Sequence, residues 1–128
     1  MFFKATAAMT QGRFSLMERT LPPYGRMPPR HFHETNDEAY YVLDGSVEFH
    51  VGDEDAFQGG PSTFVLVPAG LAHTFGNTSS EPARLLVLHA PALDGYFIDL
   101  DRLWAAEQLP SQDDELALMR QHGMTPTL

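Results

Sequence analysis

The sequence predicts an all-β domain that is followed by one or two short helices. Up to Pro91, apolar and polar residues alternate over short runs with a period of two, which is typical of half-buried strands. Ten glycines and ten prolines are spread among these runs and mark turns rather than a linker. After Pro91 the apolar residues recur at helical spacing. Many short strands with turn signals between them are typical of a sandwich or a barrel.

The strands are expected in short runs that end at turn residues. In chain order we expect a strand at 13–21, a glycine- and proline-rich approach at 22–30, a hairpin at 38–56, a polar turn at 53–61, and short strands within 62–70, 71–77 and 83–91. Asp44–Gly45 is a common two-residue hairpin turn. Alternation then places Glu38, Tyr40 and Val42 on one face of the first hairpin strand, and Val47, Phe49 and Val51 on the inner face of the second.

The helical part is expected in two pieces. Residues 94–109 carry Phe97, Leu100, Leu103 and Trp104 at helix-like spacing. Ser111 is a suitable N-cap for a second helix over 112–122, which has acidic residues in its first turn and Gly123 at its end. Residues 124–128 are short and polar, and we expect no structure of their own there.

Composition excludes several classes of function. The net charge is -9, with 8 basic against 17 acidic residues, which argues against nucleic acid and anionic membranes as partners. The absence of cysteine excludes disulfides, thiolate zinc sites and thiol nucleophiles, and it fits a cytoplasmic protein. The first nine residues lack the pattern of a signal peptide, and no run is long enough to span a membrane.

Histidines and one carboxylate form the strongest chemical pattern. His31 and His33 are two residues apart, so on a strand they point to the same side, and Glu38 follows at the start of the next strand. His73 is a further candidate from a distant segment. Three imidazoles and one carboxylate suit Mn, Fe, Co, Ni, Cu or Zn, and four ligands leave exchangeable positions for catalysis. Taken alone, the histidine pair could equally be two exposed residues on an edge strand.

The spacing of these residues resembles two known motifs. Gly25, His31, His33, Glu38 and Gly45 fill every fixed position of the first motif of the cupin superfamily. Pro68, Gly70, His73 and Asn77 resemble the second motif, which usually opens with a glycine six positions before the proline. Here that position is Ser62, and Gly59–Gly60–Pro61 just before it can supply the tight turn.

The resemblance covers roughly residues 12–91 and carries several implications. It implies a single cupin domain over 1–128, with a double-stranded β-helix, or jelly-roll barrel, at about 12–91 and a helical extension at about 92–123. It also implies one divalent transition metal ion (Fe, Mn, Ni, Cu or Zn) inside the barrel, and usually a homodimer. The implied metal ligands are His31, His33, Glu38 and His73.

Around the metal we expect a small-molecule pocket with an apolar wall. The residues expected in this wall are Tyr40, Val42, Phe49, Leu66 and Phe75, for which the simpler interpretation is a place in the core. Tyr96 and Trp104 are expected to anchor the C-terminal helix on the barrel or against a partner subunit rather than to touch a substrate. His50 and His122 are interpreted as structural, whereas His89 shares a face with Leu85 and Val87 and is a weaker candidate for the pocket.

Three functions are compatible with this site. The chain resembles small quercetin-dioxygenase-like cupins, which implies a metal-dependent dioxygenase that acts with O2 on a small aromatic or enolisable substrate. In that case Glu38 is a ligand and also a general base. The alternatives are an oxygen-independent isomerase, cyclase or dehydratase, in which the metal is only a Lewis acid, and a non-catalytic binding or sensor protein.

Overall fold

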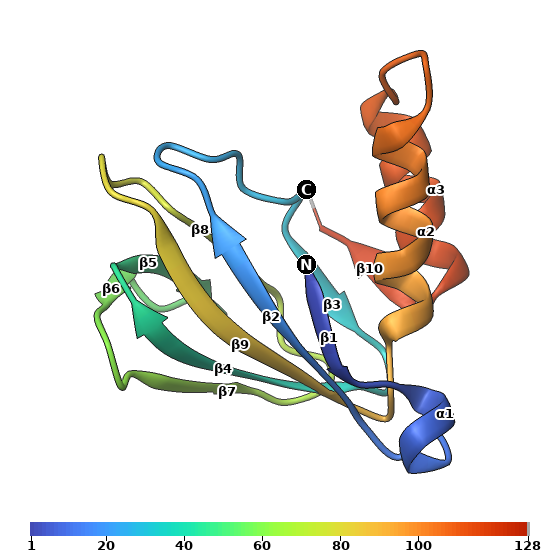
Figure 1. The fold of residues 1–128 in the computed structure, drawn as a ribbon, viewed down its shortest axis with the longest axis horizontal. Helices are drawn as coiled ribbons and strands as arrows, with labels where there is room; N and C mark the ends of the chain where they lie inside the picture. The colour runs from blue at the N-terminus through green and yellow to red at the C-terminus, as the bar shows by residue number, and fades with distance from the viewer. Residues whose placement is uncertain (128) are drawn as a thin grey trace.

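The chain folds into two antiparallel sheets that face each other, with helices at one side (Figure 1). The computed structural model describes residues 1–127. The strands are β1 (Phe2–Ala5), β2 (Ser15–Leu21), β3 (His31–His33), β4 (Asp37–Asp44), β5 (Val47–Val51), β6 (Phe57–Gly59), β7 (Phe64–Val67), β8 (His73–Gly76), β9 (Ala83–Ala90) and β10 (Met124–Pro126). The helices are α1 (Ala7–Thr10), α2 (Asp94–Ala105) and α3 (Gln112–Gln121). The predicted fold class is therefore confirmed.

The strand order is that of a double-stranded β-helix, but the barrel is not closed. One five-stranded sheet has the order β1-β2-β9-β4-β7 and the other has the order β10-β3-β8-β5-β6. Within residues 1–127 no strand pairing joins the two sheets. The four edge strands are only three or four residues long, so they offer few backbone groups with which to continue a ladder into the other sheet. The expected jelly roll is thus an open sandwich.

The core lies between the sheets and follows the expected alternation. On β4 and β9 the inward side chains pair in register, with Tyr40 opposite Val87 and Val42 opposite Leu85. The next inward pair along these strands is polar, because Glu38 lies opposite His89 and both are buried. One end of the core is therefore built from hydrocarbon and the other end from titratable groups.

Helices α2 and α3 pack at the polar end of the sandwich, beside β10 and away from β5 and β6 (Figure 1). Tyr96 and Phe97 on α2 and Met119 on α3 are buried. Ser111 caps α3 as predicted, and Asp114 completes a capping box. Among the described residues no helix is long and apolar enough to cross a membrane.

Residues 124–126 form a strand, contrary to the expectation for residues 124–128, of which Leu128 lies outside the described residues. Gly123 reverses the chain with a φ of 74°, and β10 then pairs with β3, with Met124 opposite His33. Met124 is buried, and β10 protects an otherwise unpaired edge of β3. The prediction failed because it considered the composition of the segment alone, whereas the edge of β3 supplies the missing hydrogen bonds. β1 and β6 were also not expected from the sequence.

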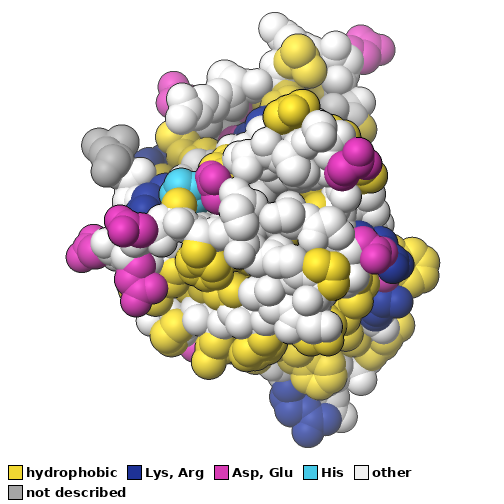
Figure 2. Space-filling view, turned by 90° about the vertical axis from the view of Figure 1, so that its left-hand side faces the viewer, with side chains coloured by type: hydrophobic (Ala, Val, Ile, Leu, Met, Phe, Trp, Pro, Cys, Tyr) yellow, Lys and Arg dark blue, Asp and Glu magenta, His cyan; other side chains and the backbone are white. Residues whose placement is uncertain are grey.

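The outer face of β4 and β7 carries exposed apolar side chains. Phe64 and Leu66 point outward from β7, whereas Val65 and Val67 point into the core. Figure 2 shows hydrophobic side chains spread over the lower half of one face of the molecule. Leu66 is 58% exposed, so the prediction that it lines the metal pocket is wrong. The strand was expected, but its alternation puts this residue on the opposite face.

Ser62 occupies a position that favours glycine. Residues Gly60 to Thr63 form a tight turn closed by a hydrogen bond from the Thr63 amide to the Gly60 carbonyl, with Pro61 second and Ser62 third. A proline followed by a residue with positive φ is the pattern of a type II turn, and the φ of Ser62 is 72°. The departure from the second motif thus keeps the turn geometry while placing a side chain in the left-handed region.

We expect Ser62→Gly to stabilise the protein by about 0.5–1 kcal/mol, because glycine removes the left-handed penalty that a side chain incurs. Urea unfolding followed by circular dichroism measures this change. Ser80→Gly is the matched control, since Ser80 is an exposed loop residue without positive φ and gains nothing from the substitution. A loss of stability in Ser62→Gly equal to that in the control would contradict the assignment.

Candidate metal centre

The four residues predicted to bind a metal converge between the two sheets. His31 and His33 come from β3, His73 from β8 and Glu38 from β4. One ligand atom from each residue lies within 4.8 Å of the others, and all four residues are buried. Three of the side chains belong to one sheet and the carboxylate belongs to the other, so the cluster links the two layers of the sandwich.

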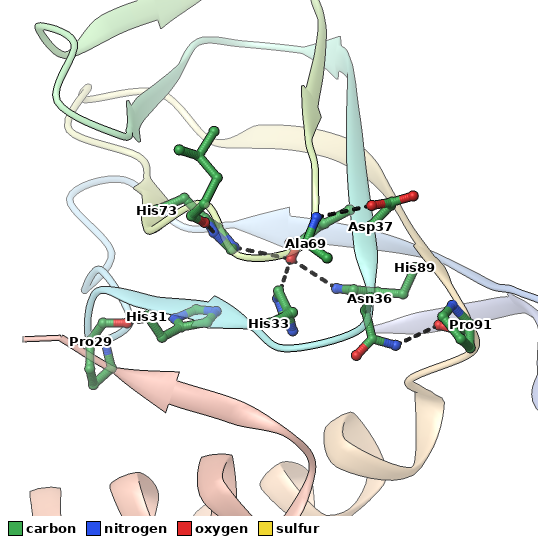
Figure 3. Close-up of polar contacts among 11 residues, drawn as sticks. Pro29, His31, His33, Asn36, Asp37, Ala69, His73, His89 and Pro91 are labelled. Atoms are coloured by element: carbon green, nitrogen blue, oxygen red, sulfur yellow. Dashed lines mark hydrogen bonds and ion pairs between the residues drawn. The ribbon is translucent and has the colours of Figure 1, made fainter.

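Local structure explains why distant segments meet here. His31 lies opposite His73 in the pairing of β3 with β8, and His33 shares the face of His31 because it is two residues further along the same strand. The start of β4 is tied to the turn before β8, because the Asp37 carboxylate accepts a hydrogen bond of 2.9 Å from the Ala69 amide. Asn36 donates a hydrogen bond of 2.8 Å to the Pro91 carbonyl, which fixes the loop between β3 and β4 (Figure 3). These contacts position Glu38 against the histidines.

Backbone carbonyls fix the tautomers of two of the histidines. Nδ1 of His31 lies 2.7 Å from the Pro29 carbonyl oxygen, and Nδ1 of His73 lies 2.9 Å from the Leu71 carbonyl oxygen. A carbonyl oxygen only accepts, so each Nδ1 carries a proton. In the neutral ring, Nε2 then has a free lone pair directed into the cluster. A histidine whose second nitrogen donates to a carbonyl is the usual arrangement at metal sites.

One oxygen of Glu38 faces three imidazole nitrogens. Its Oε2 atom lies 2.6 Å from Nε2 of His33, 3.1 Å from Nε2 of His73 and 3.0 Å from Nε2 of His89. The His89 nitrogen lacks hydrogen-bond geometry despite this short distance. At these distances the lone pairs of the carboxylate oxygen and of the imidazole nitrogens repel each other unless a cation lies between them. This cation is either a proton or a metal ion. The donor set therefore fits a divalent transition metal.

Burial and charge shift the pKa values of the residues in this cluster. Burial lowers the pKa of His31 to about 4, so this ring is neutral at pH 7. Burial opposes ionisation of Glu38, but the imidazoles of His89, His33 and His73 outweigh it and hold the pKa of Glu38 well below its usual range. For His73, burial favours the neutral ring, while its hydrogen bond to Glu38 prevails and raises its pKa. His31 and Glu38 therefore already have the protonation states of metal ligands, whereas His73 would release its proton when a metal binds.

A cavity of about 310 Å³ opens from this cluster toward the helices. Its volume is at the lower end of the range for small-molecule sites. The cavity is lined by charged, imidazole and aromatic side chains, among them His31, His33, Glu38, His89, Arg19, Arg26, Phe75, Tyr96, Phe97, Trp104 and Glu115. Residues of the approach between β2 and β3 complete the wall, among them Pro22, Gly25 and Pro28. The cavity therefore lies between the sandwich and its C-terminal extension.

The predicted pocket wall is only partly correct. Phe75 lines the cavity as expected. Tyr40, Val42 and Phe49 point to the same interior but lie deeper, fully inside the hydrocarbon core. Strand alternation tells which face a residue occupies but does not tell its depth along the sandwich. These residues belong to the hydrophobic core and do not line the cavity.

Several cavity residues were missed or assigned another role. Tyr96 and Trp104 line the cavity, so α2 is part of the wall and not only an anchor. His89 lines it too and lies beside Glu38, although it was only a weak candidate. Arg19 was not singled out at all, even though its register with Met17 and Leu21 on β2 was a sign that it points inward. A charged residue at an apolar position of an alternating strand is the signal that could have revealed it.

Comparison with known proteins identifies the class of protein. Residues 17–89, more than half of the chain, match the cupin domain family, so the chain belongs to the cupins. A sequence comparison with curated proteins finds no match.

Solved structures extend this result. TT1209 from Thermus thermophilus is 32% identical with a TM-score of 0.60, and the match covers 72% of this chain and 86% of that one. The polyketide cyclase RemF from Streptomyces resistomycificus is 33% identical with a TM-score of 0.55, over 61% of this chain and 54% of RemF. The DMSP lyase DddQ from Ruegeria pomeroyi is 26% identical with a TM-score of 0.54, over 62% of this chain and 39% of DddQ. The chain thus spans about half of RemF and less of DddQ.

We expect the purified chain to bind one zinc or other divalent transition metal ion, as measured by elemental mass spectrometry and calorimetric titration. His73→Ala should weaken metal binding by more than about a hundredfold. Removal of a metal ligand lowers the affinity more than removal of a residue that only hydrogen-bonds to a ligand. Chelation should also lower the Tm of the wild type, since the metal binds only the folded state.

His50→Ala is the matched control for this experiment. His50 lies on β5, next to the strand of His73, and its ring hydrogen-bonds to Glu48 away from the cluster. Metal binding should be unchanged in this variant. Equal affinity in His73→Ala and His50→Ala would show that the second motif does not complete the site.

Proposed function

We propose that the chain is a metal-dependent enzyme that removes a proton from a small enolisable molecule without using dioxygen, in the class of isomerases, cyclases and lyases. One observation carries this proposal: a single buried carboxylate, Glu38, adjoins both the histidine cluster and the cavity. A carboxylate in this position can take a proton from a ligand in the cavity. The apolar wall around it excludes the water that would compete for that proton.

The chain's own residues divide the work in this proposal. His31, His33, His73 and Glu38 would hold the metal, which when bound supplies a Lewis acid that polarises a carbonyl group. Glu38 would act as the base. His89, 3.0 Å from the same carboxylate oxygen, would hold the carboxylate when it leaves the metal to accept a proton. Phe75 and Phe97 would pack against the body of the ligand.

Two related structures support the oxygen-independent reaction. RemF is a polyketide cyclase and DddQ is a DMSP lyase, and both exceed 25% identity to this chain. Cyclisation through a carbonyl carbon and elimination across a carbon–carbon bond each require removal of a proton beside an activating group. Glu38 supplies the base for either reaction. Which substrate is used depends on the cavity wall, which the C-terminal helices provide here.

A dioxygenase is the second candidate. The three imidazoles and one carboxylate leave ligand positions open toward the cavity, and the aromatic wall of Phe75, Tyr96 and Trp104 suits a flat substrate. A quercetinase-like enzyme would use the same residues, with Glu38 again as the base. Oxygen dependence separates the two candidates, because only the dioxygenase consumes O2 with turnover.

We expect the metal-loaded protein to catalyse deuterium exchange at C3 of 2-oxo-4-phenylbutanoate in D2O under strict anaerobiosis. The reason is that Glu38 removes the proton beside the carbonyl. Proton NMR follows the loss of the C3 signal. Glu38→Gln should slow the exchange by about a hundredfold or more while retaining much of the metal, since removal of a general base typically has an effect of this size.

The His50→Ala protein is the control for this assay, and the metal content of every sample is measured in parallel. Exchange no faster than in buffer would argue for a non-catalytic binding protein. Uptake of O2 in air that depends on the metal, without anaerobic exchange, would favour the dioxygenase. Equal losses of metal and of exchange in Glu38→Gln would contradict the dual role of this residue.

A further inference from the structure

Arg19 occupies a position where a core residue is expected. It lies on β2 between Met17 and Leu21, both of which are buried, and it pairs in register with the fully buried Leu85 of β9. Its side chain is partly buried, lines the cavity, and stacks on the Phe75 ring with 5.6 Å from the guanidinium carbon to the ring centroid. A guanidinium at the inner face of a sheet is unusual because charged groups are rarely buried without a partner.

The guanidinium of Arg19 has no protein partner of opposite charge. Within residues 1–127 it forms neither an ion pair nor a hydrogen bond, although Glu38 and Asp101 line the same cavity. Arg26, the other arginine in the wall, is occupied: it pairs with Glu115 and stacks on Trp104. Burial also lowers the pKa of Arg19, which reflects the unfavourable desolvation of its charge. A guanidinium that points into a cavity and has no acidic partner is a candidate binding group for an anion.

We propose that Arg19 binds the carboxylate of an aryl acid in the cavity and thereby directs the rest of the molecule toward the Glu38 cluster. The planar guanidinium offers two parallel N–H donors that match the two oxygens of a carboxylate. The aromatic side chains of Phe75, Phe97 and Tyr96 line the same cavity as Arg19 and Glu38 and suit a ring. The substrate class depends on the proposed function, whereas the anion site itself does not.

A carboxylate fits this site better than a phosphate. A phosphate carries close to two negative charges and needs several donors, while Arg19 is the one arginine of the wall without an acidic partner among the described residues. Glu38, Asp101 and Glu115 also line the cavity and would repel a dianion. The volume of about 310 Å³ limits the acid to one or two rings.

Binding of 2-naphthoate and of its neutral amide, 2-naphthamide, tests the proposal by isothermal titration calorimetry. Both probes have the same ring system, so they differ only in the group offered to Arg19. We expect the wild type to prefer the acid by at least tenfold. Arg19→Met should abolish this preference, and Arg19→Lys should keep only part of it, because an ammonium group cannot make the bidentate contact.

Arg84→Met is the matched control, since Arg84 is on the neighbouring strand β9 but faces outward and pairs with Asp44. The titrations are made with zinc-loaded and with chelated protein. A preference that persists in the chelated protein and disappears in Arg19→Met supports the anion site even if the proton-exchange assay fails. Equal binding of acid and amide, no binding of the acid at millimolar concentration, or an unchanged preference in Arg19→Met would overturn the proposal.

Discussion

The contact between the Glu38 carboxylate and the surrounding imidazoles is the constraint on which this structure depends. It joins the two sheets at the end of the core where hydrophobic packing stops, because Glu38 is on β4 and its partners His33 and His73 are on the opposite sheet. Burying a carboxylate is unfavourable unless charge and hydrogen bonds compensate for it. Here the compensation comes from side chains that are also suitable metal ligands. The same cluster therefore links the two layers and supplies a set of donors that fits a divalent metal ion.

The C-terminal extension completes both the fold and the cavity. β10 covers the edge of β3, the strand that carries two of the candidate ligands, and α2 and α3 form the wall opposite them. Without this extension the cluster would lie at the open end of a sandwich, accessible to water. Because the helices supply Tyr96 and Trp104, they decide what shape of molecule can reach Glu38. Under the proposed function, variation in this segment would change the substrate while the candidate ligand set stays constant.

The histidine pair could be placed on one face from the sequence because two residues that are two apart on a strand share a face. The complete ligand set could be predicted only because the spacing of Glu38 and His73 resembles the two cupin motifs, since these residues come from segments distant in sequence. The depth of a side chain has no such local signal, which is why Val42 and Phe49 were expected at the pocket but lie in the core. β10 was missed because its order comes from the edge of β3 and not from its own residues. Arg19 was missed because an arginine in an alternating strand is normally assigned to the outer face.

The charge of the whole chain makes the position of Arg19 more informative. With a net charge of -9, the surface repels anionic ligands at long range, so an acid is bound only if the cavity provides local positive charge. Arg26 contributes little to this because Glu115 neutralises it, which leaves Arg19 as the unpaired cation of the wall within the described chain. An anion held at Arg19 would place its uncharged end toward the His31, His33 and Glu38 side of the cavity. Arg19 would then hold one end of the ligand, and the other end would face the Glu38 carboxylate. The ligand would therefore be oriented before any chemical step begins.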